Sequence, residues 1–353
     1  MDARIETILQ YGLMAPSGDN CQPWKFKVNG LCVDLFNAAD RDHSLYNLKQ
    51  RASLIAHGTL LENIRISAPV VGLGSRVELF PNADNIQHVA TVEFSERAKE
   101  NASPLFAAIA QRHTNREKYQ RVKISDSQLE QWQKLPEQTG EKIWVANQRQ
   151  QIAHLAGLLS LNDRLVFETP ALHRFLFEQI RWSDAEAQKS GDGLDIKTLG
   201  LNPLDKVAFR FLQHWGAVSA LNKVGFSRIV QLKAGQLIKS ASAIVMVTIP
   251  RAEPIDYVKG GQLWQRLLLQ LTSEGLTAQP IAGLACLMQA AVEGLLDDEM
   301  TALQQQWLLD TRTELLQIAG LSASTTILAL FRVGSAGPVV TALRKPLADF
   351  ILS

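Results

Sequence analysis

The 353-residue chain lacks several features that would have narrowed its function at once. Its three cysteines, Cys21, Cys32 and Cys286, form neither a CxxC motif nor a Cys/His cluster, so they predict neither a disulfide framework nor a zinc site. No GxxxxGK[ST] or GxGxxG sequence occurs, and nucleotide binding by a standard phosphate loop is therefore unsupported. HExxH and GxSxG are also absent and the seven histidines are dispersed, which disfavours metal hydrolysis and a serine triad.

An excess of one charge is missing too, because 36 basic and 35 acidic residues give a formal net charge of +1. We therefore expect no nucleic-acid partner and no membrane partner, and any anion site must be local. The apolar runs are short: AIVMVTI at 243–249 has the length of a strand, far below the roughly 18 residues of a membrane span. With 46% hydrophobic and 20% charged residues, the composition is typical of a globular protein of about two domains, expected in a reducing cytoplasm.

Hydrophobic spacing predicts a mixture of helices and strands. Ile5, Ile8, Leu9 and Leu13 have helical spacing, and WKFKV and LCVDLF predict a hairpin that turns at Asn29-Gly30. Residues 51–68 and 261–272 predict buried helices, while 243–249 and 325–333 predict strands. The middle of the chain differs, because helical patterns rich in Trp and Phe are interrupted by KSGDGLD and LGLNP. We interpret this part as a helical insertion.

One internal offset suggests a repeat. Gly58 and Gly72 have the same spacing as Gly261 and Gly275, and each glycine of the second pair lies 203 positions after its counterpart in the first. Leu60 and Ile64 fall opposite Leu263 and Leu267 at the same offset. In a chain with 22 glycines such a match supports a duplicated unit only together with other observations.

The segment APSGDNCQPWKF, residues 15–26, separates the first helix from the first strand. Gly18 tolerates unusual backbone angles, Pro16 and Pro23 fix φ, and Ala15 and Gln22 are expected to be extended because a proline follows each. The Ser17 hydroxyl and the Asn20 amide can donate and accept hydrogen bonds, as a small-molecule site requires. The alternative is a turn whose polar residues only bond local backbone.

The segment RHTNRE, residues 112–117, gathers two guanidinium groups, a hydroxyl and an amide, and Arg344 and Lys345 follow near the C-terminus. Arginine binds phosphate oxygens bidentately and a threonine hydroxyl adds a directional donor, so this set could hold a monophosphate. A solvated charged turn is the alternative.

Together these segments resemble the nitroreductase superfamily of flavin enzymes. APSGDNCQPW is similar to its APSxxNxQPW loop and RHTNRE to its RxSxR phosphate motif. QPIAG at 279–283 is similar to the loop against the flavin ring, and LRKPLADFI at 343–351 to its C-terminal Arg-x-Pro-Leu element. The resemblance implies FMN as cofactor.

The order of the motifs implies a tandem arrangement. In a simple nitroreductase the RxSxR motif precedes the APS loop, whereas here it follows about ninety residues later. The chain therefore resembles the tandem group that includes the mycobacterial Acg-type proteins, in which one polypeptide mimics the usual homodimer; further dimerisation stays open. We expect an α+β protein of two fused halves, each a mainly antiparallel sheet flanked by helices. The halves would be residues 1–108 and 109–353, with the helical insertion at about 163–239.

The resemblance also implies the site residues. Pro16, Ser17, Gly18 and Asn20 would reach over a flavin held by the second half. The phosphate would be held by Arg112, Thr114, Arg116 and Arg344. The ring would be lined by Pro280, Ile281, Ala282 and Gly283, with the backbone N–H of Ala282 or Gly283 toward N5. No catalytic side chain and no metal are implied, and the lack of a second copy of either motif implies one flavin per chain.

The function implied is an FMN-dependent oxidoreductase that passes hydride from NAD(P)H to a small acceptor. A second reading is a protein that sequesters FMN beneath the insertion, which would close over the flavin as a lid and exclude nicotinamide. A third is a tailoring dehydrogenase that works beside an adenylating partner. A structural domain without flavin is the last alternative, and the co-occurring motifs disfavour it.

Overall fold

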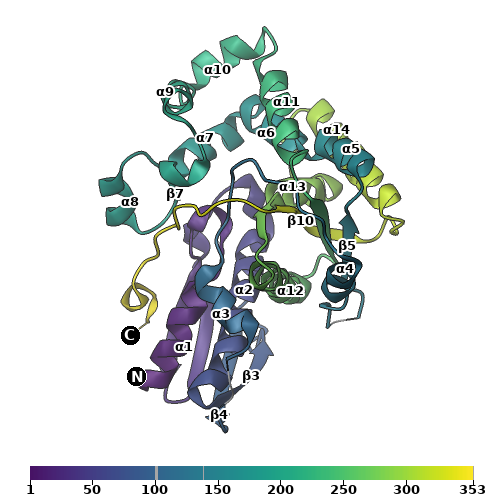
Figure 1. The fold of residues 1–353 in the computed structure, drawn as a ribbon. Coiled ribbons are helices and arrows are strands. Elements are labelled where there is room, and N and C mark those ends of the chain that lie inside the picture. Colours follow the sequence, from purple (N-terminus) through teal and green to yellow (C-terminus); the bar gives the residue numbers. More distant parts are fainter. Residues whose placement is uncertain (100–101, 138, 353) are drawn as a thin grey trace.

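The chain forms two four-stranded antiparallel sheets with helices between and around them (Figure 1). The computed structural model describes residues 1–99, 102–137 and 139–352. The strand order is β1-β2-β4-β3 in the first sheet and β5-β8-β10-β9 in the second, which confirms the expected α+β class. The strands are β1 (Trp24–Asn29), β2 (Cys32–Asn37), β3 (Leu73–Leu79), β4 (His88–Glu96), β5 (Lys142–Ala146), β8 (Ala243–Ile249), β9 (Thr277–Pro280) and β10 (Thr326–Gly334).

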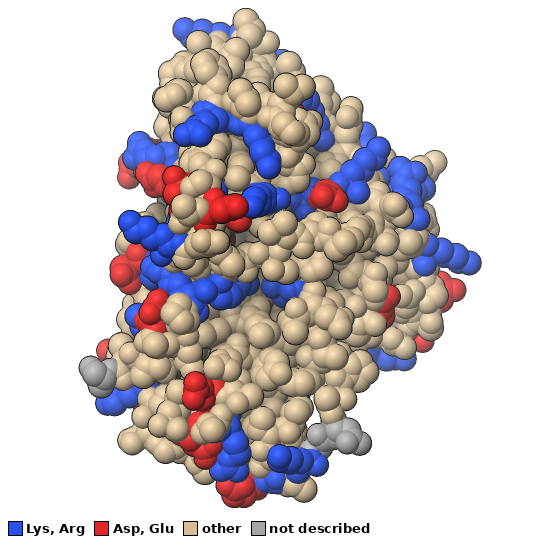
Figure 2. All heavy atoms as spheres, turned by 60° about the vertical axis from the view of Figure 1, so that its left-hand side comes forward, with Lys and Arg blue, Asp and Glu red and all other residues tan. Residues whose placement is uncertain are grey.

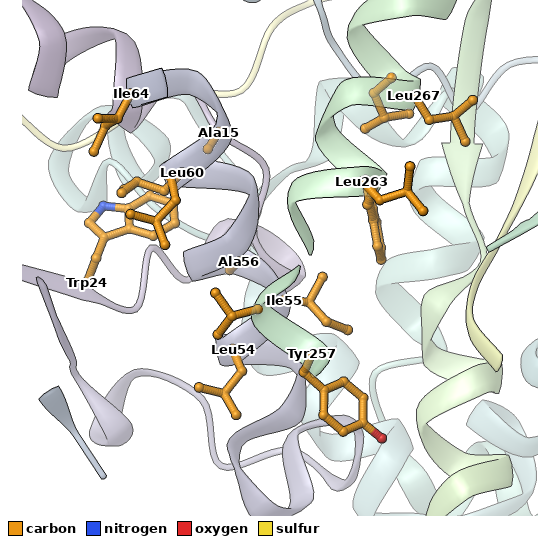
Figure 3. Packing of buried hydrophobic residues seen from close by; sticks show 14 of the residues in the cluster. Ala15, Trp24, Leu54, Ile55, Ala56, Leu60, Ile64, Tyr257, Leu263 and Leu267 are labelled. Carbon is orange, nitrogen blue, oxygen red and sulfur yellow. The ribbon is translucent and has the colours of Figure 1, made fainter. Parts of the chain in front are cut away.

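Helices α2 (Arg51–Ser67) and α12 (Pro254–Ser273) pack against each other in the centre. Their apolar side chains belong to one buried cluster that also contains residues of both sheets; Figure 3 shows part of it, with Leu60 of α2 near Trp24. The expected amphipathic helix is α1 (Ala3–Leu13), which buries Ile5, Ile8, Leu9 and Leu13. The other helices outside the middle region are α3 (Pro104–Gln111), α4 (Asp126–Gln133), α13 (Ala282–Val292) and α14 (Ala302–Ile318).

The predicted hairpin is present, but its turn is shifted by one residue. Asn29 pairs with Cys32, so the two turn residues are Gly30 and Leu31 rather than Asn29 and Gly30. Gly30 takes the left-handed conformation, with φ of 61°. Asn29 remains in the strand ladder because Gly30, which follows it, takes the positive φ that the turn requires.

The two sheets repeat one topology. In chain order β5, β8, β9 and β10 correspond to β1, β2, β3 and β4, and the correspondence reproduces the strand order of the sheets. Helix α1 precedes β1 as α4 precedes β5, and α2 follows β2 as α12 follows β8. The second unit carries two additions: a helical region between β5 and β8, and α13 with α14 between β9 and β10.

The crossing of α2 and α12 joins the two units at the glycines of the 203-residue offset. A Cβ atom on Gly58 would lie 2.0 Å from the carbonyl oxygen of Val258, and one on Gly261 would lie 2.2 Å from that of Ile55. Val258 and Ile55 are themselves 203 positions apart. The two contacts are therefore related as the two halves of a two-fold interface are, and both require glycine.

Polar pairs at this crossing show the same relation. Arg266 Nε donates to Glu62 Oε1 at 2.9 Å, and Gln265 Nε2 donates to Asn63 Oδ1 at 2.7 Å. Positions 62 and 265 correspond under the offset, as do 63 and 266. One pair is charged and its counterpart is neutral, so equivalent positions carry different side chains.

The region between β5 and β8 is almost entirely helical and covers one end of the molecule (Figure 1). The expected insertion limit at residue 163 falls inside one of its helices and the expected boundary at 108/109 falls inside α3. In the described residues no helix is both long and apolar enough to cross a membrane. The region comprises α5 (Arg149–Leu159), α6 (Leu161–Glu168), α7 (Pro170–Gln179), β6 (Ile180–Arg181), α8 (Asp184–Ser190), β7 (Leu194–Asp195), α9 (Pro203–Phe211), α10 (Trp215–Asn222) and α11 (Phe226–Ile238).

Candidate functional site

A cavity of about 240 Å³ lies where four distant segments meet: the loop after α1, the segment after α3, the region around β7, and the C-terminal segment after β10. In Figure 1 the C-terminal segment runs from β10 past β7 toward α1. The cavity thus lies between the first unit, the second unit and the helical region. Its lining comprises Met14, Pro16, Ser17, Asp19, Asn20, Ile109, Ala110, Arg112, His113, Thr114, Arg116, Gly193, Leu194, Thr198, Val340, Thr341, Ala342 and Arg344.

Most of the residues expected to bind the cofactor meet in this cavity. From the first half they are Pro16, Ser17 and Asn20, and from the phosphate motif and the C-terminal element they are Arg112, Thr114, Arg116 and Arg344. Gly18, Pro280, Ile281, Ala282 and Gly283 are not among its lining residues in the described structure. The expected phosphate side is therefore brought together, while the expected ring side lies apart from this cavity.

The loop after α1 departs from its expected backbone. The left-handed conformation is taken by Asp19, Asn20 and Gln22, with φ of 42°, 60° and 52°, and not by Gly18; Gln22 is not extended either. The buried amide of Gln22 accounts for this, because its Nε2 donates to the carbonyls of Asn20 at 3.1 Å and Gly191 at 2.9 Å. Strained angles of this kind persist where surrounding contacts fix them.

Arg344 ties the C-terminal segment to the end of α1. It donates to the carbonyls of Leu13 at 3.2 Å and Ala15 at 3.4 Å and to Oδ1 of Asn20, and Asn20 Nδ2 donates back to the carbonyl of Leu343 at 2.9 Å. These carbonyls carry the negative end of the helix dipole, which favours a cation there.

The phosphate-motif segment is held by its own buried amide, which was not among the expected cofactor-binding residues. Asn115 is fully buried; its Nδ2 donates to the carbonyl of Gly337 at 3.1 Å and its Oδ1 accepts from the N–H of Glu117 at 2.9 Å. The Tyr119 hydroxyl donates to the Asn115 carbonyl at 2.7 Å. These bonds fix the backbone of Thr114 and Arg116 on either side.

The cavity has a surplus of positive charge. Among the described residues no carboxylate forms an ion pair with Arg112, Arg116 or Arg344, and Arg112 Nε is buried without a hydrogen-bond partner. Burial, with Arg344 nearby, lowers the pKa of Arg112 to about 9, and burial lowers the pKa of Arg344 to about 10. Burial also lowers the pKa of Arg116, against the opposing effect of Asp19.

Asp19 is the one acid in the cavity lining that the structure describes. Burial raises its pKa to about 6 although Arg116 is close enough to oppose this. Three guanidinium groups against one carboxylate leave a surplus of two positive charges. On the face shown in Figure 2, Lys and Arg side chains form a band across the middle of the molecule.

The expected ring loop lies at the end of β9 and the start of α13. Ile281 N–H donates to the carbonyl of Leu330 at 2.7 Å. The Cβ position of Gly283 is 2.7 Å from Tyr46 Cε1 and 3.1 Å from Asn162 Oδ1, so Tyr46 of the first unit and Asn162 of α6 lie directly on this loop. Burial raises the pKa of Tyr46, and the nearby Asp19 adds to the effect.

Arg332 on β10 is a charged residue that the sequence reasoning missed. It is fully buried, lies 3.9 Å over the Tyr119 ring, and its Nε donates to Gln279 Oε1 at 2.5 Å. One of its terminal nitrogens, Nη1, has no partner in the described structure. A charge inside the apolar run TILALFRV was the available signal, since an arginine within a buried strand requires a polar surrounding.

The helical region covers the cavity through Gly193, Leu194 and Thr198. Asp192 holds this part in place by pairing with Arg41 at 2.7 Å, Arg181 at 2.7 Å and Lys345 at 3.2 Å. Burial opposes ionisation of Asp192, yet these three cations hold its pKa at about 2. The cover is thus fastened to the first unit and to the C-terminal segment through one carboxylate.

Sequence comparison relates the chain to mycobacterial proteins. It is 23% identical over 279 residues to the uncharacterised protein MT1398 of Mycobacterium tuberculosis CDC 1551, covering 78% of this chain and 38% of that protein. It is 33% identical over 93 residues to acg of Mycobacterium tuberculosis H37Rv, a protein assigned by name to the NAD(P)H nitroreductases, covering 26% of this chain and 28% of that protein. The second match relates part of the chain to a protein named as an NAD(P)H nitroreductase.

The matched parts span less than two thirds of these relatives' own length. No family model matches the chain. Among solved structures, the nitroreductase with bound FMN from Desulfitobacterium hafniense DCB-2 overlaps 71% of this chain and 98% of its own, with 15% identity and a TM-score of 0.37. The relationship to the nitroreductases therefore rests on the sequence matches.

Proposed function

We propose that the chain binds FMN and acts as an NAD(P)H-dependent oxidoreductase. The observation that carries the proposal is the cavity in which unpaired guanidinium groups and hydroxyls meet from both halves. Arg112 has a buried donor without a partner, and Ser17 and Thr114 add hydroxyl donors. The relationship to acg, named as an NAD(P)H nitroreductase, supports the same function.

The residues present fit the phosphate of FMN. A phosphate monoester carries close to two negative charges near neutral pH, which matches the surplus of two positive charges in the cavity. Partial burial lowers the pKa of Arg112 and of Arg344, and a bound dianion would favour their charged forms. The bidentate fork of arginine suits phosphate oxygens.

The remaining residues have complementary roles in this proposal. Pro16, Ser17, Gly18 and Asn20 would cover the cofactor from the first half, while Pro280, Ile281, Ala282 and Gly283 would face its ring. Ala282 and Gly283 begin α13, and N–H groups in the first turn of a helix have no partner within the helix. They would therefore be available as donors. Bound FMN supplies the hydride chemistry, accepting from NAD(P)H and passing to a small acceptor.

The chain would hold this site as two fused units. We propose a first half that ends before α3 and a second half that contains the helical region between β5 and β8, with one FMN site per chain. The repeated sheet topology and the paired glycines at the α2 and α12 crossing support the division. The fused units would act as a homodimer does, because each contributes residues to the cavity.

One observation favours a second function, the sequestering of FMN without turnover. The region around β7 covers the cavity and Asp192 fastens it to both halves. A fastened cover would exclude nicotinamide while retaining FMN. The two functions make the same prediction for binding and opposite ones for reduction by NAD(P)H.

The binding proposal is tested by Arg112→Ala and Arg116→Ala, singly and together, with isothermal titration of FMN into apoprotein. A charge-assisted hydrogen bond contributes about 1.5–3 kcal/mol, so each substitution should weaken binding by roughly tenfold to 150-fold. Arg251→Ala, on an exposed arginine remote from the cavity lining, is the control. Unchanged affinity in the double variant would overturn the phosphate assignment.

The catalytic proposal is tested by an anaerobic visible spectrum of the FMN-loaded protein during addition of NADPH and then NADH. Bleaching at a catalytic rate supports the oxidoreductase. A flavin that dithionite bleaches and neither nicotinamide reduces would support sequestration, and Asp192→Asn should then restore bleaching.

A further inference from the structure

Helices α9 and α10 and the beginning of α11 lie at one end of the molecule, farthest from β3 and β4, and α11 then runs inward beside α5 and α6 (Figure 1). None of the nine residues of α9 is buried. Large apolar side chains on these helices and their connections face water, with exposed fractions from 53% to 83%. They are Leu204, Val207, Phe211, Val224, Ile229 and Leu232. We refer to these six residues as the apolar end.

The exposed apolar residues of α9 lie on one side of the helix. Leu204, Val207 and Phe211 lie three and four positions apart, so they share one face of the helix. Phe209, on another face, packs against the core of the helical region. Helix α9 therefore carries apolar side chains on two faces. The inner face packs against the helical region, and the outer face has no partner in the described structure. Exposed apolar patches of this kind mark interaction surfaces.

The charged side chains of the same stretch are mostly basic. Residues 203–238 contain the bases Lys206, Arg210, Lys223, Arg228 and Lys233 and the single acid Asp205, although the whole chain has a formal net charge of +1. None of these five bases pairs with a carboxylate in the described structure. On the face shown in Figure 2, the upper end carries Lys and Arg among uncharged residues, and Asp and Glu appear only lower down.

We propose that the apolar end docks on the surface of a membrane that contains anionic lipid. Exposed aliphatic and aromatic side chains on helices, flanked by Lys and Arg, are the composition of segments that lie in the lipid interface. The apolar groups enter the boundary of the acyl chains while the bases meet anionic headgroups. The proposal departs from the expectation of no membrane partner, which rested on a net charge that averages over this local excess.

The charge also bears on other occupants. A second copy of the chain, docked through the same end, would bring five bases against five and suffer like-charge repulsion. An anionic bilayer offers opposite charge to the bases and an apolar interior to the exposed side chains.

The test is sedimentation of the FMN-loaded full chain with vesicles of phosphatidylcholine alone and of phosphatidylcholine mixed with phosphatidylglycerol. Wild-type protein should bind the mixed vesicles, and high salt should weaken binding because it screens surface charges. Leu204→Ser with Phe211→Ser should weaken binding about tenfold or more. Arg228→Gln with Lys233→Gln should lower it by roughly tenfold.

The matched control is Ile86→Ser with Leu303→Ser, which removes two exposed apolar side chains from other parts of the surface and should bind as wild type. All variants should keep the wild-type melting temperature and bound FMN, so a failure of flavin binding is a separate result. Wild-type protein that ignores the mixed vesicles would overturn the proposal, as would wild-type binding by Leu204→Ser with Phe211→Ser. Light scattering that shows a dimer dissociated by those substitutions would assign the surface to a second copy.

Discussion

Replacing Gly58 by alanine is expected to damage the chain where its two units meet. The new Cβ would lie 2.0 Å from the carbonyl oxygen of Val258. Real Cβ atoms essentially never approach another atom within 3.0 Å, so α2 and α12 would have to separate by about 1 Å. The obstacle is backbone on both sides, and no side-chain rotation relieves it.

The magnitude follows from two opposing effects. Overpacking costs about 1–3 kcal/mol, and the upper value applies because two rigid helices must move. Alanine in place of glycine inside a helix stabilises by about 0.5–1 kcal/mol. The net loss is about 2 kcal/mol. With an unfolding entropy of about 2.1 cal/mol/K per residue, this lowers the melting temperature of the 353-residue chain by about 3 °C.

The assay is calorimetry of FMN-loaded Gly58→Ala, Gly261→Ala and the double variant. Separation of the helices relieves both clashes, so the double variant should lose less than the sum of the single losses. Gly157→Ala on α5, where an added Cβ meets nothing within 4 Å, is the control and should be slightly stabilised. Gly58→Ala with wild-type or higher stability would refute the close approach of the helices.

Two further predictions concern charges. Glu62→Gln should destabilise by about 1.5–3 kcal/mol, because Arg266 loses its bonds to a buried carboxylate and keeps only its ion pair with the exposed Glu137 at 3.0 Å. Urea denaturation measures this, with the exposed Glu96→Gln as control, and a loss below about 1 kcal/mol would contradict it. Asp192, with a pKa of about 2 against an ordinary 3.8, should contribute stability that is fully present above pH 3.8 and is lost as pH falls toward 2. Acid titration of Asp192→Asn should lack this component, and a profile identical to wild type would contradict the role of its three ion pairs.

Local patterns predicted much of the fold. The spacing of Ile5, Ile8 and Leu9 predicted α1, and the run AIVMVTI predicted β8, because burial on one helix face or along a whole strand leaves a periodic trace. The turn at Gly30 was displaced by one residue, since two neighbouring residues could each take a positive φ. The prediction that Gln22 is extended was wrong, because the Gly191 carbonyl to which its side chain donates belongs to a segment far away in the chain.

The residues of the candidate site also fall into two groups, those that the sequence indicated and those that only the structure revealed. Arg112, Thr114, Arg116 and Asn20 could be singled out in the chain itself, because each belongs to a short motif whose chemistry depends on neighbouring residues. Tyr46, Asp192 and Arg332 belong to no motif, and they act through partners more than a hundred positions away or through burial. Asn115 lies inside RHTNRE, but its role depends on the carbonyl of Gly337, 222 positions away. The one-dimensional order of residues carries periodicity, turn chemistry and motifs. The meeting of α2 with α12, the charge surplus of the cavity and the cover fastened by Asp192 exist only where long-range packing brings distant groups within contact distance.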